Sequence, residues 1–158
     1  MHAKHVWAPA CLLSAAALAL SAAPAGAAKQ SQLKFFSHNV TTSITDPSGK
    51  PLTGGPVAGA KLVVTDVNYA GNHKRHARRY TSTDHLVCSF TGPATGVCDG
   101  QFTVGPSMLL SENVTIDFSA KLTFPITGGT GKYRGAKGTI VSTSIPGSAD
   151  TDDVIKLR

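Results

Sequence analysis

ITGGTGKYRGAKGTI, residues 126–140, carries the clearest structural signal in this 158-residue chain. Five glycines lie within it, and the residues that follow Gly138 are the β-formers Thr139, Ile140 and Val141. Glycine allows the backbone to adopt positive φ or to pass close to a neighbouring strand. The stretch therefore predicts a tight turn at the corner of a β-barrel, leading directly into a strand.

The glycines are not spaced as they are in a nucleotide-binding loop. Gly128, Gly131 and Gly135 match neither GxGxxG nor GxxxxGK[ST]. No amphipathic helix follows them that would offer its N-terminus to a phosphate. We therefore interpret the stretch as structural.

Residues 1–27 have the features of an export signal. Lys4 supplies a positive N-terminal region, residues 12–23 form an apolar run too short to span a bilayer, and Ala25-Gly26-Ala27 is a small-x-small cleavage site. An uncleaved membrane anchor would need a longer apolar run. A lipidated cysteine would follow the apolar run, whereas Cys11 precedes it. We expect cleavage after Ala27 and a secreted mature chain.

The mature chain, residues 28–158, has the length of one domain. Its charge is modestly positive, since the whole chain has 15 Lys and Arg against 9 Asp and Glu. It lacks the basic stripe with stacking aromatic residues that is typical of a nucleic-acid binder. No segment of it is long and apolar enough for stable membrane insertion. We expect no nucleic-acid partner and no stable insertion into a membrane.

Two cysteines, Cys88 and Cys98, remain after export. Thr91-Gly92-Pro93-Ala94-Thr95-Gly96 lies between them and predicts a turn, so the flanking segments can pair as a hairpin with the sulfurs facing each other. The pair lacks the spacing of a zinc site, and a redox-active pair would be closer in sequence. We predict a structural disulfide, which an oxidising compartment permits.

Apolar and polar residues alternate with period two along the mature chain, which indicates an all-β domain. A short connection at Leu109 and Leu110 could form one helical turn, and the fifth predicted strand could split near Ser119. The final strand extends almost to the terminus, so closing it against the first strand would remove both exposed edges. We predict a single eight-stranded antiparallel β-barrel. The segments predicted as strands are residues 33–44, 60–69, 79–90, 96–104, 114–126, 138–145 and 152–157.

Three segments resemble one known family. The run FPITGGTGKYRGAKG, residues 124–138, resembles the signature of the dirigent and allene oxide cyclase-like barrel superfamily, in which a GGTGxF/Y turn precedes an A-R-G step. Phe35-Phe36-Ser37-His38-Asn39-Val40 is similar to the FxxHDI pattern of its first strand. Val64-Thr65-Asp66 is similar to the acidic end of its second strand. The resemblance covers nearly all of the mature chain.

The resemblance implies a barrel with a central cavity that opens at one end and binds a reactive, mostly apolar small molecule. Members of the superfamily cyclise such molecules or direct their coupling, and many form trimers. Positioning of a reactive molecule alone can lower its barrier. This chain has Asn39 where dirigent proteins have an aspartate, and Lys137 where the motif has an arginine. Asparagine cannot act as a carboxylate base, and lysine lacks the planar fork of arginine.

Candidate site residues follow from this resemblance and from the alternation. If Asn39 faces the lumen, then Phe35, Ser37 and Thr41 lie beside it, whereas Phe36, His38 and Val40 point outward. The alternative is that these residues simply fill a narrow barrel. The candidates for catalysis are Asn39, Asp66, Tyr133 and Lys137, and the candidates for ligand contact are Phe35, Ser37, Thr41, Tyr69 and Arg134.

Several residues have an equally simple structural interpretation. Asp66 can be an exposed strand-end carboxylate, and Tyr133, Arg134 and Lys137 can be solvated residues at the rim of the barrel. The sequence shows no catalytic triad, no metal-ligand spacing and no cofactor motif.

Two functions remain open from the sequence. The first is a lumen that binds a small hydrophobic molecule and steers its cyclisation, isomerisation or coupling. The second is a non-catalytic barrel that contacts an anionic surface polymer through a basic cluster, unless that cluster is merely solvated. The cluster consists of His73, Lys74, Arg75, His76, Arg78 and Arg79.

Overall fold

The computed structural model describes residues 31–158. The predicted export signal, its cleavage site and Cys11 lie outside the described residues. Within residues 31–158, no helix is long and apolar enough to cross a membrane.

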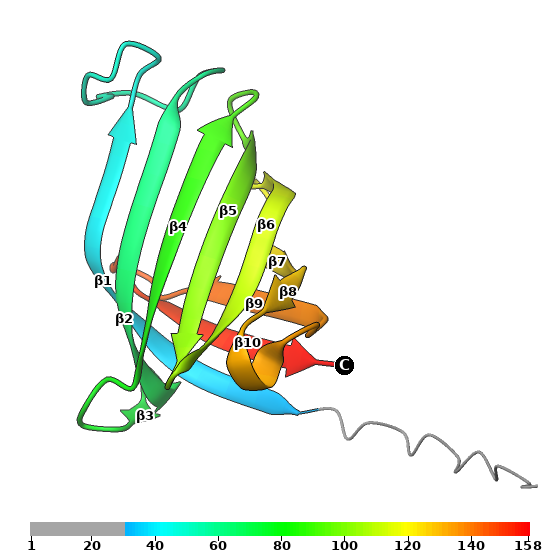
Figure 1. The fold of residues 1–158 in the computed structure, drawn as a ribbon. Coiled ribbons are helices and arrows are strands. Elements are labelled where there is room, and N and C mark those ends of the chain that lie inside the picture. The colour runs from blue at the N-terminus through cyan, green and yellow to red at the C-terminus, as the bar shows by residue number, and fades with distance from the viewer. Residues whose placement is uncertain (1–30) are drawn as a thin grey trace, which may run out of the picture.

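The described chain is all-β, with a single 3-10 turn (Figure 1). Ten strands join into one antiparallel sheet, which curls into a nearly closed barrel. The strands are β1 (Gln32–Thr45), β2 (Lys61–Asn72), β3 (Arg75–His76), β4 (Ser82–Phe90), β5 (Thr95–Val104), β6 (Ser107–Asp117), β7 (Thr123–Ile126), β8 (Gly128–Gly129), β9 (Gly138–Ser144) and β10 (Thr151–Leu157), and the 3-10 turn is η1 (Gly131–Tyr133).

The predicted pairing of the last strand with the first is confirmed. β10 lies antiparallel to β1, and Phe35 pairs with Asp153 in this register. From β1 the sheet continues through β2, β4, β5 and β6 to β8, and from β10 it continues through β9 to β7. Segments from the two ends of the chain therefore lie side by side.

The prediction of eight strands is wrong in number. The segment predicted over residues 114–126 is divided between β6 and β7 on either side of Ser119, as the prediction allowed, but the short strands β3 and β8 add two more. Leu109 and Leu110 belong to β6 and form no helical turn. The alternation explains this, because Ser107, Leu109 and Ser111 are buried on one face of the strand.

The glycine stretch closes the barrel. β7 pairs with β9, whereas β8, only one residue further along the chain, pairs with β6. Thr127 lies between them and donates its backbone N–H to the carbonyl of Leu110 at 2.9 Å. On the β7 side, Ser111 Oγ donates to the carbonyl of Pro125 at 2.7 Å. This junction, residues 123–129 against β6, is the seam of the barrel.

Apolar residues from most of the longer strands fill the two ends of the interior. Phe35 and Phe102 pack with their ring centroids 5.1 Å apart, and Phe90 packs against Phe118 at the same distance. Cys88 and Cys98 are bonded across the β4–β5 pair and are fully buried on the inner face. The predicted disulfide is therefore confirmed as part of the core.

We expect a methyl group at Gly129 to weaken the seam. A Cβ there would lie 2.6 Å from the carbonyl oxygens of both Met108 and Tyr133, which are backbone atoms that cannot move aside. Gly129→Ala should lower the free energy of unfolding in urea by about 2–3 kcal/mol, as forced overpacking does. Gly128→Ala is the matched control, because nothing lies within 4 Å of a Cβ at that position. Equal stability of the two variants would contradict this account of the seam.

Candidate functional site

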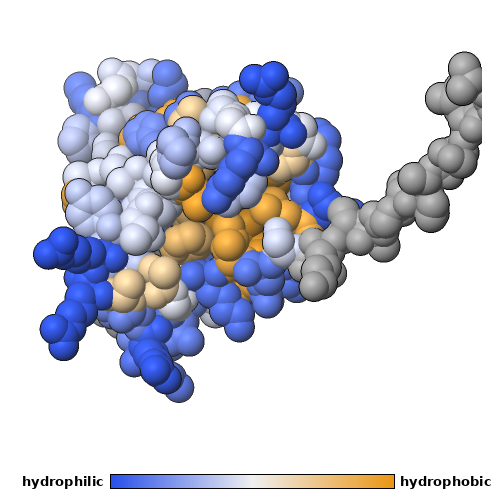
Figure 2. Space-filling model, turned by 60° about the horizontal axis from the view of Figure 1, so that its bottom comes forward, coloured by the Kyte–Doolittle hydropathy of each residue, from blue (hydrophilic) through white to orange (hydrophobic). Residues whose placement is uncertain are grey.

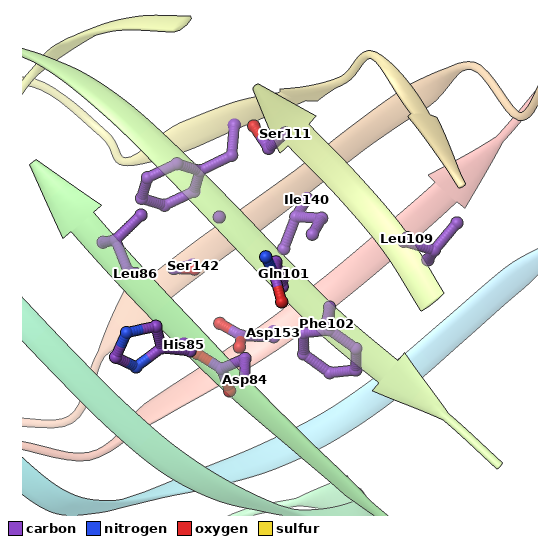
Figure 3. Close-up of a pocket in the computed structure, with 12 residues that line it drawn as sticks. Asp84, His85, Leu86, Gln101, Phe102, Leu109, Ser111, Ile140, Ser142 and Asp153 are labelled. Atoms are coloured by element: carbon purple, nitrogen blue, oxygen red, sulfur yellow. The ribbon is translucent and has the colours of Figure 1, made fainter. Parts of the chain in front are cut away.

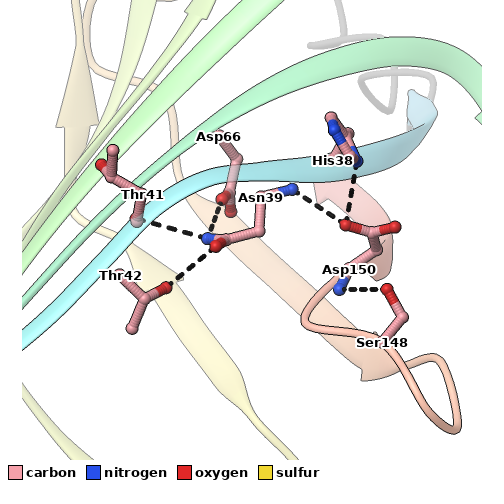
Figure 4. A network of polar contacts seen from close by, with 7 residues as sticks. All are labelled: His38, Asn39, Thr41, Thr42, Asp66, Ser148 and Asp150. Atoms are coloured by element: carbon pink, nitrogen blue, oxygen red, sulfur yellow. Dashed lines mark hydrogen bonds and ion pairs between the residues drawn. The ribbon is translucent and has the colours of Figure 1, made fainter.

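Asn39 and Asp66 meet on the inner face of the sheet (Figure 4). The β1–β2 register places them opposite each other, and Asn39 Nδ2 donates to Asp66 Oδ1 at 2.7 Å. Thr42 Oγ1 donates to Asn39 Oδ1 at 3.1 Å, which fixes the orientation of the amide. Burial raises the pKa of Asp66, although the hydrogen bond from Asn39 opposes this shift.

A second carboxylate, Asp150, ties β1 to the turn between β9 and β10 (Figure 4). It accepts a hydrogen bond from the backbone N–H of Asn39 at 3.0 Å, and its Oδ1 lies 3.1 Å from His38 Nδ1. Ser148 Oγ accepts from the backbone N–H of Asp150 at 3.0 Å. Asp150 therefore fixes the backbone of Asn39, whereas Asp66 accepts a hydrogen bond from its side-chain amide.

Asp84 lies opposite Asp66 on the neighbouring strand β4. Asn68 Nδ2 donates to its Oδ1 at 2.7 Å. Burial raises the pKa of Asp84 to about 7, and the negative charges of Asp66 and Asp153 contribute to the rise. Like charges directly opposite each other in a sheet are unfavourable, so protonation of Asp84 relieves the pair.

Asp153 on β10 is the most deeply buried of the three interior aspartates, with 5% of its surface exposed. Ser37 Oγ donates to its Oδ2 at 2.6 Å, and Thr151 Oγ1 donates to its Oδ1 at 3.0 Å. Burial raises the pKa of Asp153, while hydrogen bonds from Ser37, Ser142 and Thr151 oppose the rise. Three carboxyl groups with raised pKa values therefore share one interior.

Asp84 and Asp153 line a cavity of about 50 Å³ (Figure 3). That volume accommodates a few water molecules or a small chemical group, because one water needs only about 10–15 Å³. The wall combines apolar side chains with a few polar ones, as ligand sites commonly do. The remaining lining residues are His85, Leu86, Gly100, Gln101, Phe102, Leu109, Ser111, Phe124, Ile140 and Ser142.

An apolar surface gathers at the end of the barrel where β1 begins and β10 ends. Figure 2 shows it in the middle of that face, with polar side chains around it. The partly buried apolar residues at this end are Leu33, Val104, Tyr133, Ala136 and Leu157. We refer to these five residues as the apolar mouth.

The structure brings four of the predicted site residues together on the inner face. Phe35 and Ser37 are buried, and Asn39 and Asp66 are bonded to each other. Ser37 also connects this group to Asp153. None of these four residues lines the cavity itself, which lies next to them around Asp84.

Thr41 and Tyr69 lie elsewhere. The β1–β2 register shifts between Asn39 and Thr41, so the alternation is interrupted and Thr41 is exposed. Tyr69 belongs to the outer face of β2, where its ring stacks on Phe36 with 5.9 Å between centroids. His76 packs against Tyr69 from the β2–β3 hairpin at 5.2 Å.

The glycine turn contributes Tyr133 and Ala136 to the apolar mouth. The Tyr133 ring is partly buried there, and Lys132 Nζ lies 4.8 Å from its centroid. Arg134 is exposed. Lys137 is also exposed, and its Nζ donates to the carbonyl of Thr127 at 2.5 Å, which ties the turn before β9 to the seam.

The basic cluster is held against the outside of the barrel. The His73 backbone N–H and Nδ1 contact the two carboxylate oxygens of Asp152 at 2.7 and 2.6 Å. The cations of the cluster are exposed and form no ion pair within residues 31–158; they are Lys74, Arg75, Arg78 and Arg79.

The sequence did not identify three residues of this interior, namely Asp84, Asp153 and Asn68. For Asp84 and Asp153, the alternation of their strands nevertheless contained a signal. Cys88 had been assigned to a disulfide in the core, and Asp84 lies four residues before it, on the same face of an alternating strand. Asp153 likewise shares a face with Ile155. No group of three or more His, Cys, Asp or Glu within residues 31–158 is placed to hold a metal ion.

Fold and site together define a nearly closed antiparallel β-barrel whose interior is both acidic and apolar. No protein-family model matches the sequence. The sequence matches no curated relative. Among solved structures, pyocyanin demethylase is similar, with a TM-score of 0.64 and 22% identity over 81% of this chain and 100% of that chain. At this identity the similarity shows a shared fold and does not carry over chemistry.

We expect Asp84 to make the barrel less stable as the pH rises. Its folded pKa of about 7 lies above the value near 4 of an unfolded aspartate, so its contribution to stability is complete below about pH 4 and is lost as the pH rises through 7. Between pH 5 and pH 8 this loss amounts to about 2.6 kcal/mol. Urea unfolding across this range should show that slope, and Asp84→Asn should reduce it.

Asp117→Asn is the matched control for this measurement. Asp117 is exposed, and its pKa is lowered by hydrogen bonds from Ser119, so it titrates below the range of interest. The slope between pH 5 and pH 8 should therefore be unchanged in this variant. An unchanged slope in Asp84→Asn would show instead that Asp84 does not titrate in this range.

Proposed function

We propose that this chain is a secreted barrel of the dirigent and allene oxide cyclase-like kind, which binds a small, mostly apolar molecule and isomerises it. The observation that supports this most strongly is Asp84, a carboxyl group with a pKa of about 7 in the wall of an apolar cavity. A general acid or base works best when its pKa lies near the working pH. Pyocyanin demethylase, whose name denotes action on a small molecule, has a similar fold.

Asp84 would act by moving a proton within the bound molecule. As a carboxylate it takes a proton from one atom, and as a carboxylic acid it returns that proton to another. The product is an isomer or a cyclised form, and no co-reactant is consumed. Acid–base catalysis of this kind contributes typically about 10²–10⁴-fold to a rate.

Asn39 and Asp66 would act through Asp84. The Asn39 amide holds the Asp66 carboxylate directly opposite Asp84, and the charge of Asp66 helps to raise the pKa of Asp84. In this arrangement the two residues set the protonation of the catalytic group without lining the cavity.

The cavity limits the size of the group that reacts. Its volume of about 50 Å³ holds a small part of a ligand, whereas sites for whole drug-sized ligands measure about 300–1,000 Å³. We assign the remaining apolar part of a larger ligand to the apolar mouth. Tyr133, one of the predicted site residues, would contact the ligand there.

We expect the cavity and the apolar mouth together to bind the uncharged fluorophore N-phenyl-1-naphthylamine, with part of the molecule in the cavity and with an increase in its emission. Gly100→Leu should abolish this binding, because a side chain at this position enters the cavity. A Cβ on Gly100 would lie 3.5 Å from Leu86 Cδ1 and 3.6 Å from Ser111 Cβ, both ordinary contacts.

Gly54→Leu is the control, because that glycine is exposed and nothing lies within 4 Å of its Cβ position. Emission should rise with Gly54→Leu as it does with the wild-type chain. An equal rise with Gly100→Leu would mean that the fluorophore binds outside the lumen.

The isomerisation is tested on a solvent extract of the cells that produce the protein. The wild-type chain should convert at least one compound in the extract into another of equal mass, as seen by untargeted liquid chromatography and mass spectrometry. Asp84→Asn should slow this conversion by about 100-fold or more, since an amide cannot take the proton. Asp117→Asn should convert at the wild-type rate. If the wild-type chain produces no equal-mass product, the barrel binds without turnover.

A further inference from the structure

The barrel interior contains more hydrogen-bond acceptors than donors. Asp66, Asp84 and Asp153 face it, whereas no Lys, Arg or His side chain is buried among residues 31–158. The only hydrogen bond to the Asp84 side chain from the described residues is the one from Asn68 to Oδ1. Asp84 Oδ2 therefore has no protein donor.

Asn68 provides a second acceptor without a donor. Its side chain is fully buried, and its Nδ2 is committed to Asp84. Its Oδ1 is buried and has no hydrogen-bond partner. Native proteins rarely leave a buried polar atom unpaired, because that costs free energy. The Asn68 oxygen lies outside the lining of the cavity, so Asp84 Oδ2 is the acceptor that a donor supplied from outside the chain could reach.

The acceptors are arranged around one space. Asn68 is paired with Ser37 in the β1–β2 register, and Ser37 donates to Asp153. Asp84 and Asp153 line the same cavity (Figure 3). Asp84 and Asp153 therefore converge from β4 and β10 on this cavity, and Asn68 on β2 fixes the orientation of Asp84.

The chemistry of this space selects an organic cation. The described residues contain no group of side chains suited to a metal ion, and the carboxylates repel anions. An ammonium group carries a positive charge and three N–H donors, which suit the two carboxyl groups that line the cavity, Asp84 and Asp153. Phe102 and Phe124 also line the cavity and offer aromatic surface, to which cations are attracted.

We propose that the cavity is a binding site for a protonated primary amine on a short hydrocarbon chain. The ammonium group donates to Asp84 Oδ2 and to Asp153, and the hydrocarbon packs against Phe102 and Phe124. This inference rests on the proposed function, in that it names the class of molecule that the lumen binds. The volume of about 50 Å³ restricts the part inside the cavity to a few heavy atoms.

Isothermal titration at pH 8, where Asp84 is ionised, tests the proposal with methylamine, ethylamine, propylamine and butylamine hydrochlorides. Each amine is compared with the alcohol of the same chain length, which has the same shape and no charge. The best amine should bind at least about 10-fold more tightly than its alcohol, because its hydrogen bonds to carboxylates are charge-assisted. Asp84→Asn should weaken amine binding about 10-fold or more, and Asp117→Asn should not change it.

A second measurement does not depend on the variants. At pH 6 Asp84 is mostly protonated, so binding of an amine should release close to one proton from the wild-type protein. Titrations in buffers with different ionisation enthalpies count this proton. Release of a proton on amine binding and none on alcohol binding would support the proposal, even if Asp84→Asn fails to fold.

Three results would overturn it. Equal affinities for amine and alcohol would overturn the preference for a cation and leave a lumen that binds neutral molecules. Binding of the neutral fluorophore N-phenyl-1-naphthylamine without binding of any of the four alkylamines would likewise show that the site takes neutral molecules and not cations. If neither the amines nor the neutral fluorophore bind, both this inference and the proposed function fail.

Discussion

Closure of the barrel at the seam is the constraint on which the rest of the structure depends. Within a few residues the chain must leave β9 and pair with β6, and Thr127 bridges the two pairings through its bond to Leu110. Gly129 permits this because its Cα lies against two backbone carbonyls where no side chain fits. Without the seam, β6 and β7 would be open edges and water would reach the inner face.

Closure also sets the chemistry of the interior. Asp66 and Asp84 are opposed on neighbouring strands, and the curl of the sheet brings Asp153 on β10 toward them. Burial in the closed interior is the largest cause of the raised pKa of each. Asp153 retains three hydrogen bonds that favour its charged form. Asp84 has one, from Asn68, so it is the group whose protonation changes near neutral pH.

The alternation in the sequence was sufficient to predict an all-β chain, and the need to protect edge strands predicted the pairing of the last strand with the first. The inward positions of Phe35 and Ser37 followed from the alternation once Asn39 was assumed to face the lumen, whereas Asp66 was singled out by the family resemblance. The alternation failed at Thr41, because the register shift after Asn39 leaves no mark in the residue pattern. Tyr69 was grouped with Asp66 by closeness in sequence, although an odd separation places the two on opposite faces. The convergence of Asp84 with Asp153 depends on the register between strands far apart in the chain, and no local pattern encodes it.

The acidic interior is costly, and that cost favours a functional origin. Asp66 and Asp84 are directly opposed, no buried cation neutralises them among the described residues, and Asn68 Oδ1 is unpaired. Apolar residues of similar volume often make a core more stable than buried charges do. The disulfide and the aromatic pairs of the same interior contribute stability that offsets this cost. Proteins depart from a consistent apolar core mainly where a site requires it, and here the two acidic residues that line the cavity, Asp84 and Asp153, are such a departure.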